Sequence, residues 1–144
     1  MTDRMLYEAE VVDGVCRYLK KKGFRITQCL ATNERGEDIK ALTPNRKQEV
    51  TIEAKAATSS NKSSNRYGKP FTPNQVTCHV AVALYAASRH VSTETLAGVA
   101  FPKNDAHVER VSKILPALKR LGIEVFWVTP DKKVDVARHW KIWD

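Results

Sequence analysis

The sequence has 144 residues, with a hydrophobic fraction of 42% and a charged fraction of 28%, which is typical of a single globular domain with a core of its own. No apolar run approaches the ~18 residues that a membrane-spanning helix needs, and the N-terminus lacks the basic start and apolar run of a signal peptide. Lys and Arg number 24 against 16 acids, so the net charge is +8. This charge favours a polyanionic partner, because neutralised phosphates release their counterions; the alternative is a basic surface without such a partner.

The first predicted elements are a helix and three strands. Apolar residues recur at helical spacing over residues 3–22, and Gly23 ends that helix. Strands are predicted over 24–30, 38–42 and 49–56, separated by two polar turns, and a loop rich in Ser and Asn follows over 58–68. Thr72 is the predicted N-cap of a second helix, which has Pro73 in its first turn and ends near residue 88.

The last third repeats strand, helix and strand. Strands are predicted over 95–101 and 123–128, with a helix between them that Asn104 caps and Gly122 ends. Pro116 lies inside this helix and predicts a kink or a boundary there. The tail 135–144 has no predicted element, and we expect Trp140 and Trp143 to pack on the body. The order predicts an α/β fold, a mixed β-sheet flanked by helices with an αβββαβαβ core, over the single domain 1–144.

The three cysteines are odd in number, and each lies in an apolar element. Cys16, Cys29 and Cys78 are also widely spaced along the chain. This pattern predicts reduced core thiols in a cytoplasmic protein, with neither a disulfide framework nor a C-x-x-C metal site.

Two predicted strands carry charged residues where Val, Ile or Thr is usual. Asp38 lies in one strand, and Glu53 and Lys55 lie two residues apart in the next, so Glu53 and Lys55 share a face. If the strands are neighbours, Asp38 lies beside Glu53, and two adjacent carboxylates repel unless a cation binds between them. Such hard oxygens suit Mg²⁺, and a lysine there can stabilise charge on a phosphate. The alternative is a solvated strand face with Glu53 and Lys55 as a surface pair.

The segments GEDI (36–39) and IEAK (52–55), together with the order of elements, resemble the PD-(D/E)XK nuclease superfamily, which has the restriction-endonuclease-like fold. The superfamily includes archaeal Holliday-junction resolvases and Mrr-type restriction enzymes. The resemblance extends from the first helix to residue 128. The proline usual before the first acid is replaced by Glu37.

The resemblance implies roles for four residues of the catalytic site. Asp38 and Glu53 would bind Mg²⁺, for which Mn²⁺ could substitute. Glu8, on the first helix, would bind the metal directly or through water, and Glu10 is a weaker candidate for that place. Lys55 would orient or polarise the attacking water.

Further residues are candidates for contacting nucleic acid. Gln75 and His79 are similar to the Q-x-x-x-Y signature of RecB-like exonucleases, with histidine in place of tyrosine. Lys62, Arg66 and Lys69 lie in an acid-free segment after the third strand and are predicted to contact phosphates. The alternatives are an ordinary helix face and a solvated loop.

These observations predict a cytoplasmic, metal-dependent endonuclease that hydrolyses phosphodiester bonds of DNA. RNA is not excluded as a substrate, no membrane partner is expected, and a homodimer is expected because many members of the superfamily are homodimers. One alternative is a catalytically inactive nucleic-acid-binding module or subunit of the same fold. Another is a protein-interaction domain whose basic surface binds an acidic partner.

Overall fold

The computed structural model describes residues 5–30, 38–58 and 69–143, in which six strands form one mixed sheet in the order β1-β2-β3-β4-β5-β6. The strands are β1 (Arg25–Cys29), β2 (Ile39–Leu42), β3 (Glu49–Ala54), β4 (Thr95–Pro102), β5 (Glu124–Val128) and β6 (Val134–Val136), and the helices are α1 (Glu8–Lys21), α2 (Pro73–Ser88), α3 (Asp105–Leu121) and the short 3-10 helix η1 (Lys141–Trp143). Strands β3, β4 and β5 are parallel, and the other neighbours are antiparallel. The predicted α/β fold with a mixed sheet is confirmed.

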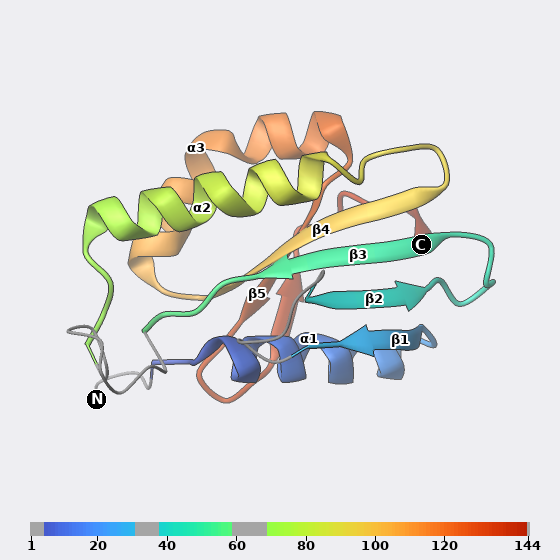
Figure 1. Cartoon of the computed structure of the whole chain (residues 1–144), viewed down its shortest axis with the longest axis horizontal. Helices are drawn as coiled ribbons and strands as arrows, with labels where there is room; N and C mark the ends of the chain where they lie inside the picture. The colour runs from blue at the N-terminus through green and yellow to red at the C-terminus, as the bar shows by residue number, and fades with distance from the viewer. Residues whose placement is uncertain (1–4, 31–37, 59–68, 144) are drawn as a thin grey trace.

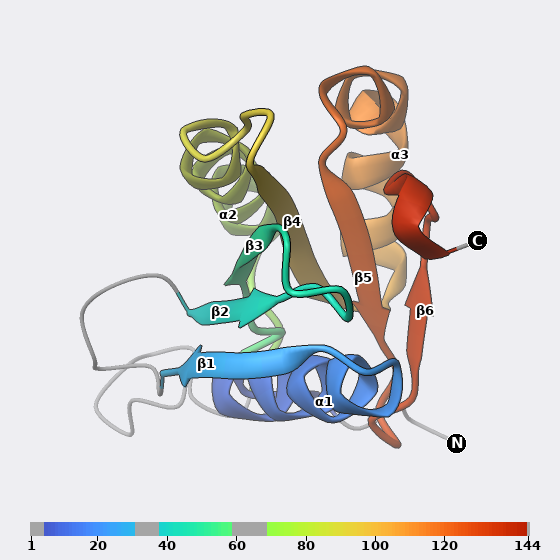
Figure 2. The same cartoon turned by 90° about the vertical axis from the view of Figure 1, so that its right-hand side faces the viewer.

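The helices cover both faces of the sheet and divide the core in two (Figure 1). Helix α1 packs on one face, where Val50, Ile52 and Ala54 of β3 are fully buried. Helices α2 and α3 pack on the other face, against alternate residues of β4 such as Val99 and Phe101. The sheet twists strongly from one edge strand to the other, so that in Figure 2 β1 and β2 point in a different direction from β5 and β6.

The starts of α2 and α3 follow the predicted caps. The Thr72 hydroxyl accepts a hydrogen bond from the Gln75 backbone N–H at 3.3 Å, and the Asn104 side chain accepts one from the His107 backbone N–H at 2.9 Å. At the end of α3, Gly122 adopts the left-handed conformation with φ 72°, which a residue with a Cβ adopts at a cost.

Helix α1 begins later than the predicted range 3–22. It starts at Glu8, and Tyr7 is its N-cap. Leu6 precedes the helix, and its backbone carbonyl accepts a hydrogen bond from the Ala57 N–H at 2.9 Å. This contact holds the segment before α1 beside the end of β3. The prediction that the first helix includes Met5 is therefore wrong.

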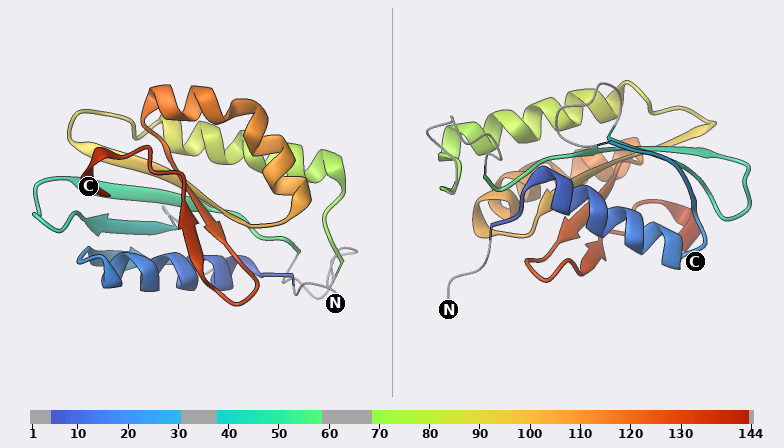
Figure 3. Two further views of the ribbon diagram at one scale, coloured as in Figure 1. Left: turned by 180° about the vertical axis from the view of Figure 1, so that it is seen from behind. Right: turned by 60° about the horizontal axis from the view of Figure 1, so that its bottom comes forward.

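The structure decides between the two alternatives at Pro116 and corrects the prediction for the cysteines. Helix α3 runs through Pro116 without a boundary, and its ribbon bends along its length (Figure 3). Cys16 is buried, but Cys29 and Cys78 are exposed, so only one of the three thiols belongs to the core. Cys29 ends the edge strand β1 and Cys78 lies on the outer side of α2, positions that the apolar character of their segments did not reveal.

The C-terminal tail packs on the body, as expected for its two tryptophans. Trp140 is buried and stacks on Trp143 with ring centroids 5.7 Å apart, and the Trp143 ring contacts Tyr18 of α1. The buried Glu124 carboxylate accepts hydrogen bonds from the backbone N–H groups of His139 (3.0 Å) and Trp140 (3.1 Å). Across the described ranges 5–30, 38–58 and 69–143, we find no helix with the length and apolar character that crossing a membrane requires.

Candidate functional site

The two acids that the sequence singles out lie at the same end of the hairpin formed by β2 and β3. The register of these strands pairs Ile39 with Ile52. Extended by one residue, this register places Asp38, which directly precedes β2, opposite Glu53, and opposite residues of an antiparallel pair point to the same face. Ile52 points into the core under α1, so Glu53 and Asp38 belong to the face that α2 covers. The predicted adjacency of the two acids therefore follows from the observed register.

Asp38 is fixed in place by backbone contacts. Its Oδ2 accepts a hydrogen bond from the Ala54 N–H at 2.8 Å, and its backbone carbonyl accepts one from the Leu30 N–H at 2.9 Å. Burial raises the pKa of the Asp38 carboxyl, and the Ala54 N–H and the charge of Lys55 partly oppose this rise. The carboxylate would therefore gain from a cation nearby, because a positive charge stabilises its ionised form.

Lys55 follows β3 directly and lies on the same side as the acids. Its Nζ is 3.8 Å from Glu53 Oε1, and both side chains are only about one-fifth exposed, at 19% and 22%. The Lys55 N–H donates to the Ala100 carbonyl at 3.0 Å, which extends the pairing of β3 with β4 by one residue. Asp38, Glu53 and Lys55 thus form one group on well-paired backbone.

The role of Glu8 in a metal site stays a prediction. Glu8 is the first residue of α1, two positions after Leu6, whose carbonyl accepts the Ala57 N–H beside the end of β3. Within the described parts of the chain, no three His, Cys, Asp or Glu side chains form a group that could hold a metal ion. Glu10 has a structural role, because its Oε1 accepts the Tyr7 N–H at 3.0 Å and completes the capping box of α1.

Gln75 and His79 lie on α2 beside this face, but their contacts differ. The Gln75 side chain accepts the Thr72 N–H at 2.7 Å and so caps its own helix. The His79 ring packs edge-on against Phe71, with centroids 4.5 Å apart. Burial lowers the pKa of His79, and so does the positive charge of Lys55. Of these two residues, His79 is therefore the one whose pKa is affected by Lys55 of the candidate site.

The basic segment after β3 is described only at its end. Lys62 and Arg66 lie outside the described residues. Lys69 is exposed, and its backbone carbonyl accepts a hydrogen bond from the Thr58 hydroxyl at 2.6 Å. Lys69 is thereby held next to a residue only three positions after Lys55, which is compatible with its predicted contact to a phosphate.

All three long helices begin at the edge of the sheet where β3 and β4 end. In Figure 1 the ribbons of α1, α2 and α3 start on the left, the side to which β3 and β4 run. Unpaired N–H groups give the start of each helix a partial positive charge. The fold therefore adds a field that favours anions near Asp38, Glu53 and Lys55.

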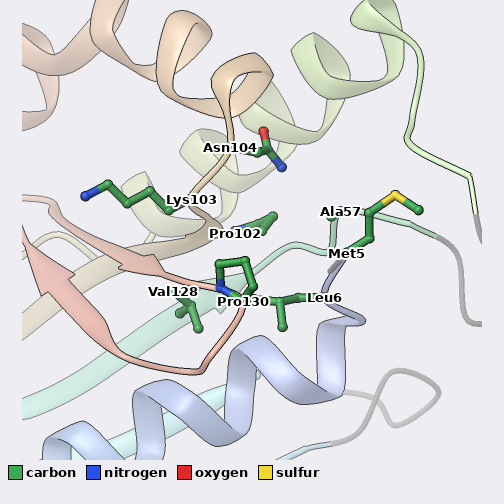
Figure 4. A pocket seen from close by; sticks show the side chains of 8 residues that line it. All are labelled: Met5, Leu6, Ala57, Pro102, Lys103, Asn104, Val128 and Pro130. Carbon is green, nitrogen blue, oxygen red and sulfur yellow. The ribbon is translucent and has the colours of Figure 1, made fainter. Parts of the chain in front are cut away.

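Two small pockets lie at this same edge. One of about 80 Å³ lies between the segment before α1 and the ends of β4 and β5 (Figure 4) and is lined by Met5, Leu6, Ala57, Pro102, Lys103, Asn104, Val128 and Pro130. The other, of about 210 Å³, lies under the starts of α2 and α3, and its lining includes Phe71 and His107. Asp38, Glu53 and Lys55 line neither of these two pockets.

His107 is a buried residue near this edge that the sequence did not single out. It is 1% exposed, and its Nδ1 lies 2.9 Å from the Asn104 side-chain oxygen. Its Nε2 has no hydrogen-bond partner within the part of the chain that is described. Burial lowers its pKa to about 4, with smaller contributions from His79 and Arg110. No motif marks this histidine, because its burial depends on how α3 packs against Phe101.

The Asp38-Glu53 pair fits a magnesium ion in its chemistry. Both residues supply hard carboxylate oxygens, and Mg²⁺ commonly binds to one or two carboxylates while water and substrate phosphate complete its shell. Burial raises the pKa of Asp38, and a bound cation would lower this pKa by stabilising the ionised carboxylate. Comparison of the chain with protein-family models, with curated proteins and with solved structures found no match.

Proposed function

We propose that this protein is a Mg²⁺-dependent endonuclease of the PD-(D/E)XK superfamily that hydrolyses phosphodiester bonds of DNA. The observation that carries the proposal is the register of β2 and β3, which pairs Ile39 with Ile52 and so leaves Asp38 and Glu53 at the same end of the hairpin, with Lys55 Nζ 3.8 Å from Glu53 Oε1. An acid-x-lysine pattern alone is common, and a surface ion pair would explain Glu53 and Lys55. Such an ion pair would not need a second acid on the neighbouring segment, so it does not explain Asp38.

Each residue of the group has a distinct task in this proposal. Asp38 and Glu53 would hold the metal, which supplies a Lewis acid and a more acidic bound water when it is present. The Ala54 N–H fixes the Asp38 carboxylate in one orientation. Lys55 orients the attacking water and stabilises the negative charge that develops on the phosphate.

The remaining surface of this edge would hold the substrate backbone. The net charge of +8, the helix starts and the exposed Lys69 favour a polyanion. Lys62 and Arg66, outside the described residues, remain proposed phosphate contacts. RNA offers the same phosphate chemistry, and the choice of DNA rests on the resemblance to the superfamily.

We propose a homodimer that forms through the outer face of α2. Residues 73–88 contain no Asp, Glu, Lys or Arg, and Val82 and Tyr85 are exposed at 52% and 67%. Two copies that each carry a charge of +8 repel one another least where no charge lies between them. Tyr85→Glu would therefore shift the protein to monomer in size-exclusion chromatography with light scattering, whereas Val108→Glu on α3 would not. A monomeric parent protein would contradict this interface.

A binding module without catalysis is the second candidate function. It is favoured by one observation: no group of three potential metal ligands occurs in the described ranges. Such a module would bind DNA in a salt-dependent manner, without cleaving it and without needing a metal.

The test combines calorimetric titration of Mg²⁺ and Mn²⁺ with nicking of supercoiled plasmid. The variants are Asp38→Asn, Glu53→Gln and Lys55→Met. The matched controls are Glu109→Gln and Lys113→Met, because Glu109 and Lys113 form an exposed ion pair at 3.8 Å on α3 and line neither of the two pockets. We expect loss of metal binding in the two acid variants, loss of nicking in all three, and parent behaviour in both controls.

The outcomes separate the two functions. Nicking that requires a metal and disappears with Asp38 supports the nuclease. Salt-dependent DNA binding without metal binding or nicking supports the module instead. Absence of DNA binding at low salt would contradict both functions and support a protein-interaction domain.

A further inference from the structure

We propose that Cys16 and Cys29 are an oxidation site at which a peroxide forms a reversible intramolecular disulfide. The two sulfur atoms lie 3.2 Å apart, in hydrogen-bond contact between α1 and β1. The proposal does not depend on the nuclease function, because it concerns a different pair of residues and a different reaction.

The fold brings these two thiols together from separate elements. Cys16 is buried on the face of α1 that packs against the sheet. Cys29 is the last residue of the edge strand β1 and is exposed. The chain reverses between the two elements through Gly23, where the Phe24 N–H donates to the Leu19 carbonyl at 3.0 Å. Backbone contacts thus hold the helix and the strand that carry the sulfurs.

The separation of the sulfurs requires only a small movement for bond formation. A disulfide bond is about 2.05 Å long, so the two atoms must approach by roughly 1.2 Å. A rotation of the exposed Cys29 side chain can supply part of this movement without breaking the pairing of Cys29 with Ile39.

The different exposure of the two residues assigns their roles. Cys29 is reached by solvent, whereas burial raises the pKa of the Cys16 thiol and the hydrogen bond to Cys29 raises it further. A thiol buried in this way reacts slowly with an oxidant in solution. Cys29 is therefore the thiol that meets the peroxide first, and Cys16 is the resolving thiol.

The reaction balances with hydrogen peroxide as the oxidant. The Cys29 sulfur attacks one peroxide oxygen, the O–O bond breaks, and Cys29 becomes a sulfenic acid while water leaves. The Cys16 sulfur then attacks the Cys29 sulfur and displaces hydroxide, which takes the Cys16 proton and leaves as a second water. Two thiols are oxidised, one peroxide is reduced, and a thiol reductant reverses the reaction by exchange.

The disulfide would form next to the strand that carries Asp38. Cys29 pairs with Ile39, and the following residue, Leu30, donates its N–H to the Asp38 carbonyl at 2.9 Å. The cross-link would tie this end of β1 to α1. Oxidation would therefore restrict the sheet edge beside the candidate site, whatever function that site has.

The test uses Cys78→Ser as the background, because Cys78 is exposed on α2 and distant in the chain from the pair. The folded protein is treated with a small excess of hydrogen peroxide, free thiols are alkylated, and tryptic peptides are identified by mass spectrometry. We expect a cross-linked pair of peptides, 5–17 with 26–35, and a mass lower by two hydrogen atoms. Dithiothreitol should restore both thiols. The midpoint of thermal unfolding should rise by roughly 5–10 °C on oxidation, since a cross-link restricts the unfolded chain.

Two additional variants separate the roles. In Cys16→Ser, Cys29 should accumulate as sulfenic acid or as an intermolecular disulfide. In Cys29→Ser, which changes an exposed residue and should leave the fold intact, Cys16 should resist peroxide. The proposal is overturned if oxidation of the Cys78→Ser protein leaves both thiols free to react with the alkylating reagent. It is overturned equally if Cys29 proceeds to sulfinic acid without any cross-linked peptide.

Discussion

Replacing His107 should remove much of the sensitivity of this protein to mild acid. The ring is 1% exposed, and burial, followed by the charges of His79 and Arg110, lowers its pKa from 6.5 to about 4. The folded protein therefore keeps this histidine neutral at a pH at which the unfolded chain protonates it. Burial lowers the pKa because a charged imidazolium inside the protein would lose its hydration without gaining a carboxylate partner.

The sign and size of the effect follow from these two pKa values. Between pH 6.5 and pH 4 the unfolded chain binds a proton that the folded protein does not, so the free energy of unfolding rises with pH in this window. The contribution of His107 is complete above pH 6.5 and is lost as the pH falls toward 4. The 2.5-unit difference between 6.5 and 4, at 1.36 kcal/mol per unit, corresponds to about 3 kcal/mol. His79, whose pKa is also lowered, adds a contribution of the same sign.

The assay is urea unfolding at a series of pH values for the parent and His107→Gln. Subtracting the two curves removes contributions that both proteins share, including that of Asp38, whose raised pKa acts in the opposite direction. We expect the variant to be less stable at pH 7.5 and the difference to shrink by about 3 kcal/mol as the pH falls to 4. A difference that stays constant across this range would refute the assignment of a buried neutral His107.

Three further substitutions test the packing that supports the candidate site. Glu124→Gln should lower the free energy of unfolding by about 2–4 kcal/mol, measured by urea with tryptophan fluorescence, because an amide N–H would face N–H donors that now bind the carboxylate. Gly98→Ala should cost about 1–3 kcal/mol in the same assay, since its Cβ would lie 3.0 Å from Phe126 Cε1. Gln75→Ala should cost about 1 kcal/mol by loss of its bond to Thr72, and unchanged DNA affinity would show that this glutamine only caps α2.

The elements set by short-range signals could be predicted from the sequence. Thr72 before Pro73, Asn104 at the start of α3 and Gly122 at its end each act within one helical turn. The hydrogen bonds that fix these boundaries join residues three or four positions apart, so the sequence contains both partners side by side.

Elements that depend on distant partners could not be predicted in the same way. Strand β6 has only three residues, and it is defined by pairing with β5, as between Val136 and Phe126. The late start of α1 depends on the bond from the Ala57 N–H to Leu6, which joins segments about fifty residues apart. The contact of Cys16 with Cys29 likewise depends on how α1 packs against β1.

The same distinction between short-range signals and contacts of distant segments applies to the candidate site. The two-residue period of a strand predicted that Glu53 and Lys55 share a face, and the hairpin register, extended by one residue beyond Ile39 and Ile52, places Asp38 opposite Glu53. The same reasoning could not place Glu8 relative to these residues, because the angle between α1 and the sheet is set by core packing. Its place in the site rests on the resemblance alone and stays a prediction.

Glu10 and Gln75 show that a residue in a motif can also have a local role. Each lies three positions after an N-cap residue, and each side chain accepts the backbone N–H of that residue. The first N–H groups of a helix need acceptors, and an acid or amide at this spacing reaches them without ordering any other segment. Thr72 followed by Gln75 thus fits a capping box as well as it fits a nuclease signature. Asp38, Glu53 and Lys55 are not in the first turn of a helix, so the need to cap a helix does not account for their position at the end of the β2–β3 hairpin.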